Sequence, residues 1–184
     1  MECKNFFFTS LFLVCLLMTV TSLTLGFGDV EIQDNKPMIT SGSLSINKTT
    51  SLEMYDNLEK YSEIYDIPKY IFYNIAFLET RYRGPFDWSY NQSKTSCVGA
   101  LGPMQVMPST ANLVHKTKVS KEKLKNDIRF NIETSAILLN KLYKQYKDWA
   151  IVCGCYNTGK PIINGYAKFC VSNLDYRKNW VYIP

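Results

Sequence analysis

Few side chains in this sequence can do chemistry, and the shortage narrows the possible mechanisms. His115 is the only histidine among the 184 residues. A single imidazole cannot build a histidine-rich metal site, and it leaves few routes to a triad of serine, histidine and aspartate. We therefore expect the chemistry to come from a carboxylate or a thiol, with no metal ion and no cofactor.

Glu79 differs from the other carboxylates. Three apolar residues precede it at helical spacing, namely Phe72, Ile75 and Ala76. The Glu79 carboxylate is therefore expected on an apolar helix face, where poor solvation favours the protonated form and raises its pKa. A general acid that works near neutral pH needs such a shift. By periodicity alone, a frayed helix end that exposes Glu79 to water or pairs it with Arg81 or Arg83 is an equal alternative.

Apolar periodicity predicts helices through most of the chain. A first helix opens at Leu52 and stops before Pro68, and a second, apolar nearly all round, runs from Pro68 to about Tyr82, before Gly84 and Pro85. The later segments are a short helix from near Pro108, a solvated loop and helix start at Lys116 to Lys125, and helices at Asn131 to Tyr146, Ala150 to Tyr156 and Pro161 to Val171. No strand pattern appears, so the fold class is all-α.

The chain divides into three parts. Residues 1–28 hold an almost unbroken apolar run from Phe6 to Val20, the layout of a signal peptide, although a retained membrane anchor is the alternative. Residues 29–51 are polar and predict a flexible linker. Residues 52–184 are long enough for one domain. We expect an exported protein of the periplasm or cell envelope, monomeric, with a net charge of +5 that suits an anionic wall polymer; a nucleic-acid role is not expected.

Four cysteines follow the export segment: Cys97, Cys153, Cys155 and Cys170. An even number in an exported chain allows one or two disulfides. Cys153 and Cys155 are too close together to pair comfortably, so a bridge would run to Cys97 or Cys170. The sequence leaves the pairing open, and buried free thiols are an equal alternative.

Four short motifs follow one another between Leu52 and Val171. They are Leu78-Glu79-Thr80, Gly99-Ala100-Leu101-Gly102-Pro103-Met104-Gln105, Asn131-Ile132 and Cys155-Tyr156-Asn157-Thr158-Gly159. In order and spacing they resemble the Glu-Ser, Gly-Leu-Met-Gln, Asn-Ile and Ala-Tyr-Asn-Ala-Gly motifs of soluble-type lytic transglycosylases, the goose-type lysozyme-like domain of glycoside hydrolase family 23. Thr80, Pro103 and Cys155 depart from the usual serine, leucine and alanine.

The resemblance implies a single lysozyme-like helical domain with a cleft that binds peptidoglycan glycan strands. Glu79 would protonate the bond between N-acetylmuramic acid and N-acetylglucosamine, then take a proton from the C6 hydroxyl, which leaves 1,6-anhydromuramyl ends. No second carboxylate is needed where the substrate's N-acetyl group stabilises the oxocarbenium-like state. The substrate-binding residues implied are Thr80, Met104, Gln105, Tyr156, Asn157 and Tyr166.

Other functions remain open at this point. Asp87, if it faced Glu79, could position a water for lysozyme-like hydrolysis. Cys97 with His115 could form a thiol hydrolase. A third alternative is a non-catalytic wall-binding component of a secretion or conjugation apparatus. The loop aromatics Phe86, Trp88 and Tyr90 could stack on sugar rings or simply pin their loop to the domain.

Overall fold

The computed structural model describes residues 49–172, 177 and 180. The predicted export segment, residues 1–28, and the predicted linker as far as residue 48 lie outside the described residues. In the part that is described, no helix combines the length and the apolar character needed to cross a membrane.

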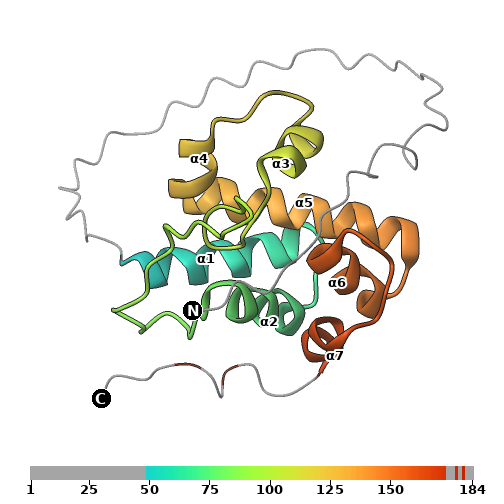
Figure 1. The fold of residues 1–184 in the computed structure, drawn as a ribbon. Coiled ribbons are helices and arrows are strands. Elements are labelled where there is room, and N and C mark those ends of the chain that lie inside the picture. The colour runs from blue at the N-terminus through green and yellow to red at the C-terminus, as the bar shows by residue number, and fades with distance from the viewer. Residues whose placement is uncertain (1–48, 173–176, 178–179, 181–184) are drawn as a thin grey trace, which may run out of the picture. The chain divides into compact units, whose positions relative to one another are not determined.

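The described residues form seven α-helices and no strands (Figure 1). Their bounds are α1 Thr50–Ile64, α2 Lys69–Thr80, α3 Pro108–His115, α4 Lys121–Asn126, α5 Ile128–Tyr146, α6 Trp149–Thr158 and α7 Gly165–Val171. Between α2 and α3, two isolated bridges, Thr95 with Leu101 and Leu101 with Val106, fold the connecting segment back on itself. The all-α prediction is confirmed.

The long helix α5 is the centre of the packing. It contacts α1, α3, α4 and α6, and α7 packs against both α6 and α2 (Figure 1). The core between these helices contains completely buried Phe72 and Ile75 from α2 and Ile132 and Leu139 from α5. Residues Ile71–Ala76 of α2 are all buried, as an all-round apolar helix requires. The core thus holds α2 firmly along the turns that precede Glu79.

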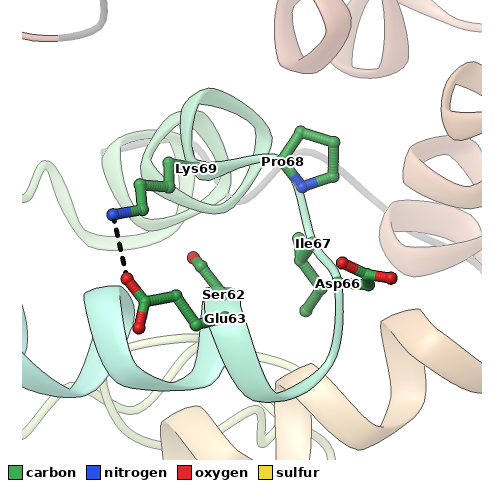
Figure 2. A pocket seen from close by; sticks show the side chains of 6 residues that line it. All are labelled: Ser62, Glu63, Asp66, Ile67, Pro68 and Lys69. Carbon is green, nitrogen blue, oxygen red and sulfur yellow. Dashed lines mark hydrogen bonds and ion pairs between the residues drawn. The ribbon is translucent and has the colours of Figure 1, made fainter.

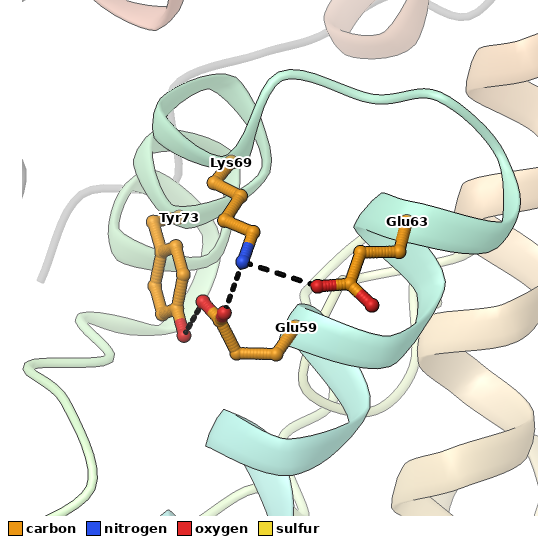
Figure 3. Close-up of polar contacts among 4 residues, drawn as sticks. All are labelled: Glu59, Glu63, Lys69 and Tyr73. Atoms are coloured by element: carbon orange, nitrogen blue, oxygen red, sulfur yellow. Dashed lines mark hydrogen bonds and ion pairs between the residues drawn. The ribbon is translucent and has the colours of Figure 1, made fainter.

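A cluster of polar side chains fixes the start of α2 against α1. The Lys69 ammonium bonds to Glu59 and lies 3.4 Å from Glu63, while the Tyr73 hydroxyl donates to Glu59 over 3.0 Å (Figure 3). The pair of Lys69 with Glu59 is partly shielded from solvent, and Tyr73 is almost completely buried. This cluster therefore anchors the end of α2 opposite to Glu79.

A shallow pocket lies at the same corner of the molecule, where α1 ends and α2 begins. Its volume is about 350 Å³, and it is lined by Ser62, Glu63, Asp66, Ile67, Pro68 and Lys69 (Figure 2). None of the predicted site residues lines it. At a rise of about 1.5 Å per residue, ten residues of α2 separate this pocket from Glu79 by roughly 15 Å. We therefore do not assign it to the candidate site.

Several helix boundaries differ from the predictions, and capping side chains explain two of the differences. The first helix begins at Thr50, two residues early, because the Thr49 hydroxyl accepts from the Leu52 N–H. The last described helix begins at Gly165 rather than Pro161, because Asn164 caps it and accepts from the Ala167 N–H. Helix α2 is shorter than predicted at both ends, and it ends at Thr80, well before Gly84.

The helix α4 was anticipated only as a helix start within a solvated loop. Ser120 caps it, and its hydroxyl accepts from the Lys123 N–H over 3.1 Å. Leu124 is its only buried residue, so apolar periodicity could not reveal the helix. The capping serine was the available signal.

Candidate active site

Glu79 lies in the last turn of α2, and the backbone stops the helix immediately after it. Arg81 adopts the left-handed conformation, with φ 62°, and its N–H bonds to the Phe77 carbonyl over 2.8 Å. Lys94 donates to the Thr80 carbonyl over 2.8 Å and satisfies another open helix carbonyl. These contacts define the helix end, so the frayed end considered from the sequence is not what the structure shows.

The Glu79 carboxylate is largely surrounded by protein, although part of the residue reaches solvent. Burial raises its pKa from 4.5 to about 7, and a hydrogen bond from Tyr166 acts in the opposite direction. The position at a helix C-terminus also disfavours a negative charge. No ion pair to Glu79 occurs among the residues the structure describes, so pairing with Arg81 or Arg83 does not compensate its charge.

Two tyrosines from separate helices lie near this carboxyl group, and one of them contacts it. Tyr166 of α7 donates its hydroxyl to Glu79 Oε1 over 2.7 Å. Tyr156 of α6 donates to the Met104 carbonyl over 2.6 Å and lies 2.9 Å from the Ser135 hydroxyl. Burial, and after it the nearby Glu79 carboxylate, raise the pKa of both tyrosines. Both phenols therefore stay protonated near neutral pH, and Tyr166 is a fixed donor to Glu79.

Thr80 and Met104 were predicted to bind substrate, but the structure places both side chains inside the protein. Thr80 is 1% exposed, and its hydroxyl lies 2.9 Å from the Pro103 carbonyl and 2.7 Å from the Tyr90 hydroxyl. Met104 is completely buried. Neither side chain reaches solvent, so a substrate contact at these two positions would have to come from the backbone. In the structure the Thr80 hydroxyl holds the loop at residue 103, and Met104 belongs to the core and holds Tyr156 through its carbonyl.

Asn131 organises the loop that carries Met104. Its side-chain oxygen accepts from the Met104 N–H over 2.9 Å, and its nitrogen donates to the Leu101 and Leu124 carbonyls over 2.9 and 2.8 Å. Gly102 has φ 73°, and a Cβ there would lie 2.6 Å from the Asn131 amide nitrogen. Only glycine fits this close approach in this conformation. The second and third sequence motifs are thus parts of one buried hydrogen-bond network.

The structure does not bring Gln105 and Asn157 into hydrogen-bond contact with Glu79. The Gln105 amide donates to the Gly102 carbonyl over 2.8 Å and stays on its own loop. The Asn157 side-chain oxygen accepts from Asn164 over 3.0 Å, which ties the end of α6 to the start of α7. Both side chains are partly accessible, so their prediction as substrate-binding residues stays a prediction.

The aromatic loop before the second motif divides into an inner and an outer part. Tyr90 is 9% exposed, bonds to Thr80 and packs edge-on against Tyr82 with ring centroids 5.2 Å apart. It therefore pins the loop to the domain. Phe86 and Trp88 are among the exposed large hydrophobic residues. Only these two aromatics keep the exposure that stacking on a sugar would need.

The described residues do not bring together the side chains that the two rival mechanisms need, hydrolysis with Asp87 and a thiol hydrolase with Cys97 and His115. Asp87 Oδ1 accepts from the Ser89 hydroxyl over 2.7 Å, and the described residues show no contact between Asp87 and Glu79. Cys97 is exposed, whereas the His115 ring bonds to Thr134 over 2.8 Å and stacks on Phe130. No hydrogen bond between described residues joins Cys97 to His115. The described part of the chain also holds no group of three or more potential metal ligands.

Ser135 contributes to the site but was not predicted, and Tyr90 was named only together with Phe86 and Trp88, with sugar stacking and pinning of the loop both open. Ser135 is completely buried and lies 2.9 Å from the Tyr156 hydroxyl. It stands four positions after Asn131 on α5, the spacing that places two residues on one helix face. That spacing was a usable signal for Ser135. Tyr90 could not have been separated from its exposed neighbours, because only the folded loop distinguishes them.

Residues 56–168 match the family described as the Transglycosylase SLT domain, which is more than half of the chain. The chain belongs to this family. The match begins within α1 and ends within α7, so it spans Glu79, both site tyrosines and the Asn131 network. A comparison with curated proteins found no match.

Solved structures of two lytic transglycosylases are similar to this SLT chain. An inactive mutant of the lytic transglycosylase Slt from Pseudomonas aeruginosa is 21% identical, with a TM-score of 0.47, and the match covers 65% of this chain and 18% of that one. The 70-kDa soluble lytic transglycosylase in complex with bulgecin A is 25% identical, with a TM-score of 0.49, and the match covers 72% and 20%. The chain therefore spans about a fifth of the length of these proteins.

The departures from the usual motifs of SLT domains have simple structural consequences. The Thr80 hydroxyl bonds to the carbonyl of residue 103, and Pro103 keeps that carbonyl although it lacks an N–H. The buried Cys155 thiol bonds to Tyr146 on α5.

Proposed function

We propose that this protein is a peptidoglycan lytic transglycosylase that uses Glu79 first as an acid and then as a base. Family membership supports the reaction class. The observation that carries the proposal is the state of Glu79, a carboxyl with its pKa raised to about 7, held by Tyr166, with no second carboxylate in contact among the described residues. A group half-protonated near neutral pH can give a proton and take one back.

In the first step, the protonated Glu79 donates to the glycosidic oxygen between N-acetylmuramic acid and N-acetylglucosamine. The C1–O bond breaks, and the substrate's own N-acetyl group stabilises the positive charge at C1. In the second step, the Glu79 carboxylate accepts the proton of the C6 hydroxyl while O6 bonds to C1. The product end is 1,6-anhydromuramic acid, Glu79 is protonated again, and no water is consumed.

Gln105 and Asn157 complete this proposal as substrate-binding residues. Their amides are suited to hydrogen bonds with sugar hydroxyls and acetamido groups. Asn157 follows Tyr156 on α6, and Gln105 follows Met104, whose carbonyl accepts from Tyr156. We further propose that the protein is exported to the periplasm or cell envelope, where its substrate lies, and that it acts as a monomer. A place in a secretion or conjugation apparatus would fit the same activity.

Mass spectrometry of digested peptidoglycan tests the reaction type. We expect muropeptides that end in anhydromuramic acid and are lighter by one water than the products of a lysozyme digest of the same sacculi. Digestion in water enriched in oxygen-18 provides a second readout, because an intramolecular attack incorporates no label. Labelled reducing ends would overturn the proposal and favour hydrolysis, with Asp87 as the residue to examine next.

Tyr166→Phe is expected to move the pH dependence of cleavage. The hydrogen bond from Tyr166 lowers the pKa of Glu79, so its loss raises that pKa further above about 7. The acid then stays protonated to higher pH, so the alkaline limb of the kcat/KM profile moves to higher pH. The maximum of kcat/KM should be lower, because Glu79 is less well oriented. The measurement is kcat/KM between pH 5 and pH 9 with soluble glycan fragments.

Tyr65→Phe is the matched control, because Tyr65 follows α1 at the corner remote from Glu79. Its profile should keep the wild-type alkaline limb. An unchanged limb in Tyr166→Phe, or a limb at lower pH, would show that Tyr166 does not tune Glu79.

A further inference from the structure

Two buried cysteines meet behind the candidate active site. Cys153 lies on α6 and Cys170 on α7, which pack against each other (Figure 1). Both side chains are completely buried, and the Cys170 thiol lies within interaction range of the Cys153 thiol and of Tyr166, the residue that donates to Glu79. The two sulfur atoms are therefore neighbours although 16 residues separate them in the chain.

The other cysteines of the described region do not compete for this pairing. Cys155 stands two positions after Cys153 on α6, so it points to a different side of that helix, and its thiol bonds to Tyr146. Cys97 is exposed on the loop before α3. The packing of α6 on α7 thus selects one pair out of the possibilities that the sequence left open.

We propose that Cys153 and Cys170 form a disulfide that cross-links α6 to α7 when the chain folds in an oxidising compartment. A disulfide carrier of the dithiol–disulfide class is the oxidant. One cysteine thiolate attacks the carrier disulfide to give a mixed disulfide, and the second thiolate then displaces the carrier sulfur. The two thiol protons pass through solvent to the carrier sulfurs, so the carrier gains two electrons and two protons and becomes its dithiol.

Burial determines when this bond can form. The contact with Cys153, together with burial, raises the pKa of the Cys170 thiol, so the folded protein holds almost no Cys170 thiolate. Both side chains are also completely buried, out of reach of a carrier disulfide. We therefore expect the bond to form during folding, before α6 and α7 close over the sulfur atoms. Reduced protein that has already folded should be oxidised much more slowly than protein that refolds with the oxidant present.

The bond would close a loop that contains several site residues. Tyr156, Asn157 and Tyr166 all lie between the two cysteines. A cross-link across a loop of this length stabilises the fold chiefly by restricting the unfolded chain. It would also hold α7, and with it the Tyr166 hydroxyl, against α6. This proposal concerns the cross-link and does not depend on which glycan product the enzyme forms.

Peptide mapping of the full chain tests the pairing directly. The protein is refolded with reduced and oxidised glutathione, free thiols are blocked, and trypsin is applied without reduction. Cleavage after Lys168 separates the two cysteines, so a disulfide-linked pair of peptides containing Cys153 and Cys170 is expected. The linked pair should persist in Cys155→Ala and disappear in Cys153→Ala. Its absence from the wild type, or its loss in Cys155→Ala, would overturn the proposal.

Thermal unfolding provides a second test that separates the cross-link from ordinary packing. Wild-type protein refolded with a reductant should unfold about 5–10 °C below the oxidised protein. The same comparison in Cys153→Ala and Cys170→Ala should give no difference, whereas Cys155→Ala and Cys97→Ala should keep it. A difference that survives in Cys153→Ala would assign the effect to another pair.

Discussion

Glu79→Gln is expected to lower the rate of peptidoglycan cleavage by about 10²–10⁴-fold, the range that a positioned general acid contributes. Glutamine keeps the size of the side chain and can still accept the Tyr166 hydrogen bond, which spans 2.7 Å to Oε1. It cannot supply a proton to the glycosidic oxygen or remove one from the C6 hydroxyl. The measurement is the release of soluble muropeptides from purified sacculi at equal enzyme concentration.

Two control variants make this result specific. Glu63→Gln removes an exposed carboxylate at the α1–α2 corner and should retain wild-type activity. Asp87→Asn removes the nearest alternative acid in sequence and should retain activity within a few-fold. If Glu79→Gln kept more than a tenth of the wild-type rate, Glu79 would not be the acid. If Asp87→Asn lost as much as Glu79→Gln, a two-carboxylate mechanism would replace the proposed one.

The pH dependence of stability shows whether the Glu79→Gln protein is folded. It also tests whether the pKa of Glu79 is raised in the folded wild-type protein. The folded-state pKa of Glu79, about 7, lies above its unfolded value of 4.5, so the native state binds more protons between these values. Wild-type stability therefore falls as pH rises through this window, relative to a variant that cannot ionise. At pH 8 Glu79→Gln should be more stable than wild type by roughly 1–2 kcal/mol. This is less than the free energy that corresponds to the whole pKa shift, because the site is partly solvated.

Urea denaturation at pH 4 and pH 8 measures this difference. The advantage of Glu79→Gln should fall close to zero at pH 4, where the wild-type carboxyl is mostly protonated in both states. An advantage that is equal at both pH values would mean that ionisation of Glu79 does not cause it.

Asn131→Ala is expected to lower the free energy of unfolding by roughly 3–5 kcal/mol. The change removes three buried hydrogen bonds, to the Met104 N–H and to the carbonyls of Leu101 and Leu124. The Leu101 carbonyl keeps the Val106 N–H as a partner, whereas the Met104 N–H loses its side-chain acceptor. It also opens a cavity beside Gly102, whose Cα lies against the Asn131 amide. Because the Met104 carbonyl accepts from Tyr156, we expect cleavage activity to fall as well. Urea denaturation at constant pH measures the stability change.

Asn140→Ala is the matched control on the same helix. Its side chain donates one hydrogen bond, over 2.8 Å, to the Tyr65 carbonyl, in a partly buried position. We expect a loss of about 1 kcal/mol and normal activity. Equal losses in the two variants would show that the Asn131 network contributes no more to the free energy of unfolding than an ordinary surface contact does.

The sequence was sufficient for the features that depend on local pattern. Apolar periodicity located most of the helices, because a helix that packs on a core must repeat its apolar residues at helical spacing. The same reasoning placed Glu79 among apolar neighbours, and its raised pKa follows from the burial that those neighbours provide. The motifs also indicated the family before any fold was available. Ser120 and Asn164, whose side chains cap α4 and α7, are local signals of the same kind for the starts of these helices.

The tertiary structure decided the matters that depend on which side chains meet. It joined Tyr166 to Glu79 across 87 residues, placed Thr80 and Met104 inside the protein, and brought Cys153 next to Cys170. None of these contacts has a periodic signal. The contacts of Tyr166 and Cys170 depend on how α7 packs against α2 and α6, and the burial of Thr80 and Met104 depends on how the loop before α3 folds onto α2 and α5. Glu79 by itself was only an acid with a poorly solvated carboxyl. Its donor, and the helix packing that holds that donor, exist only in the folded chain.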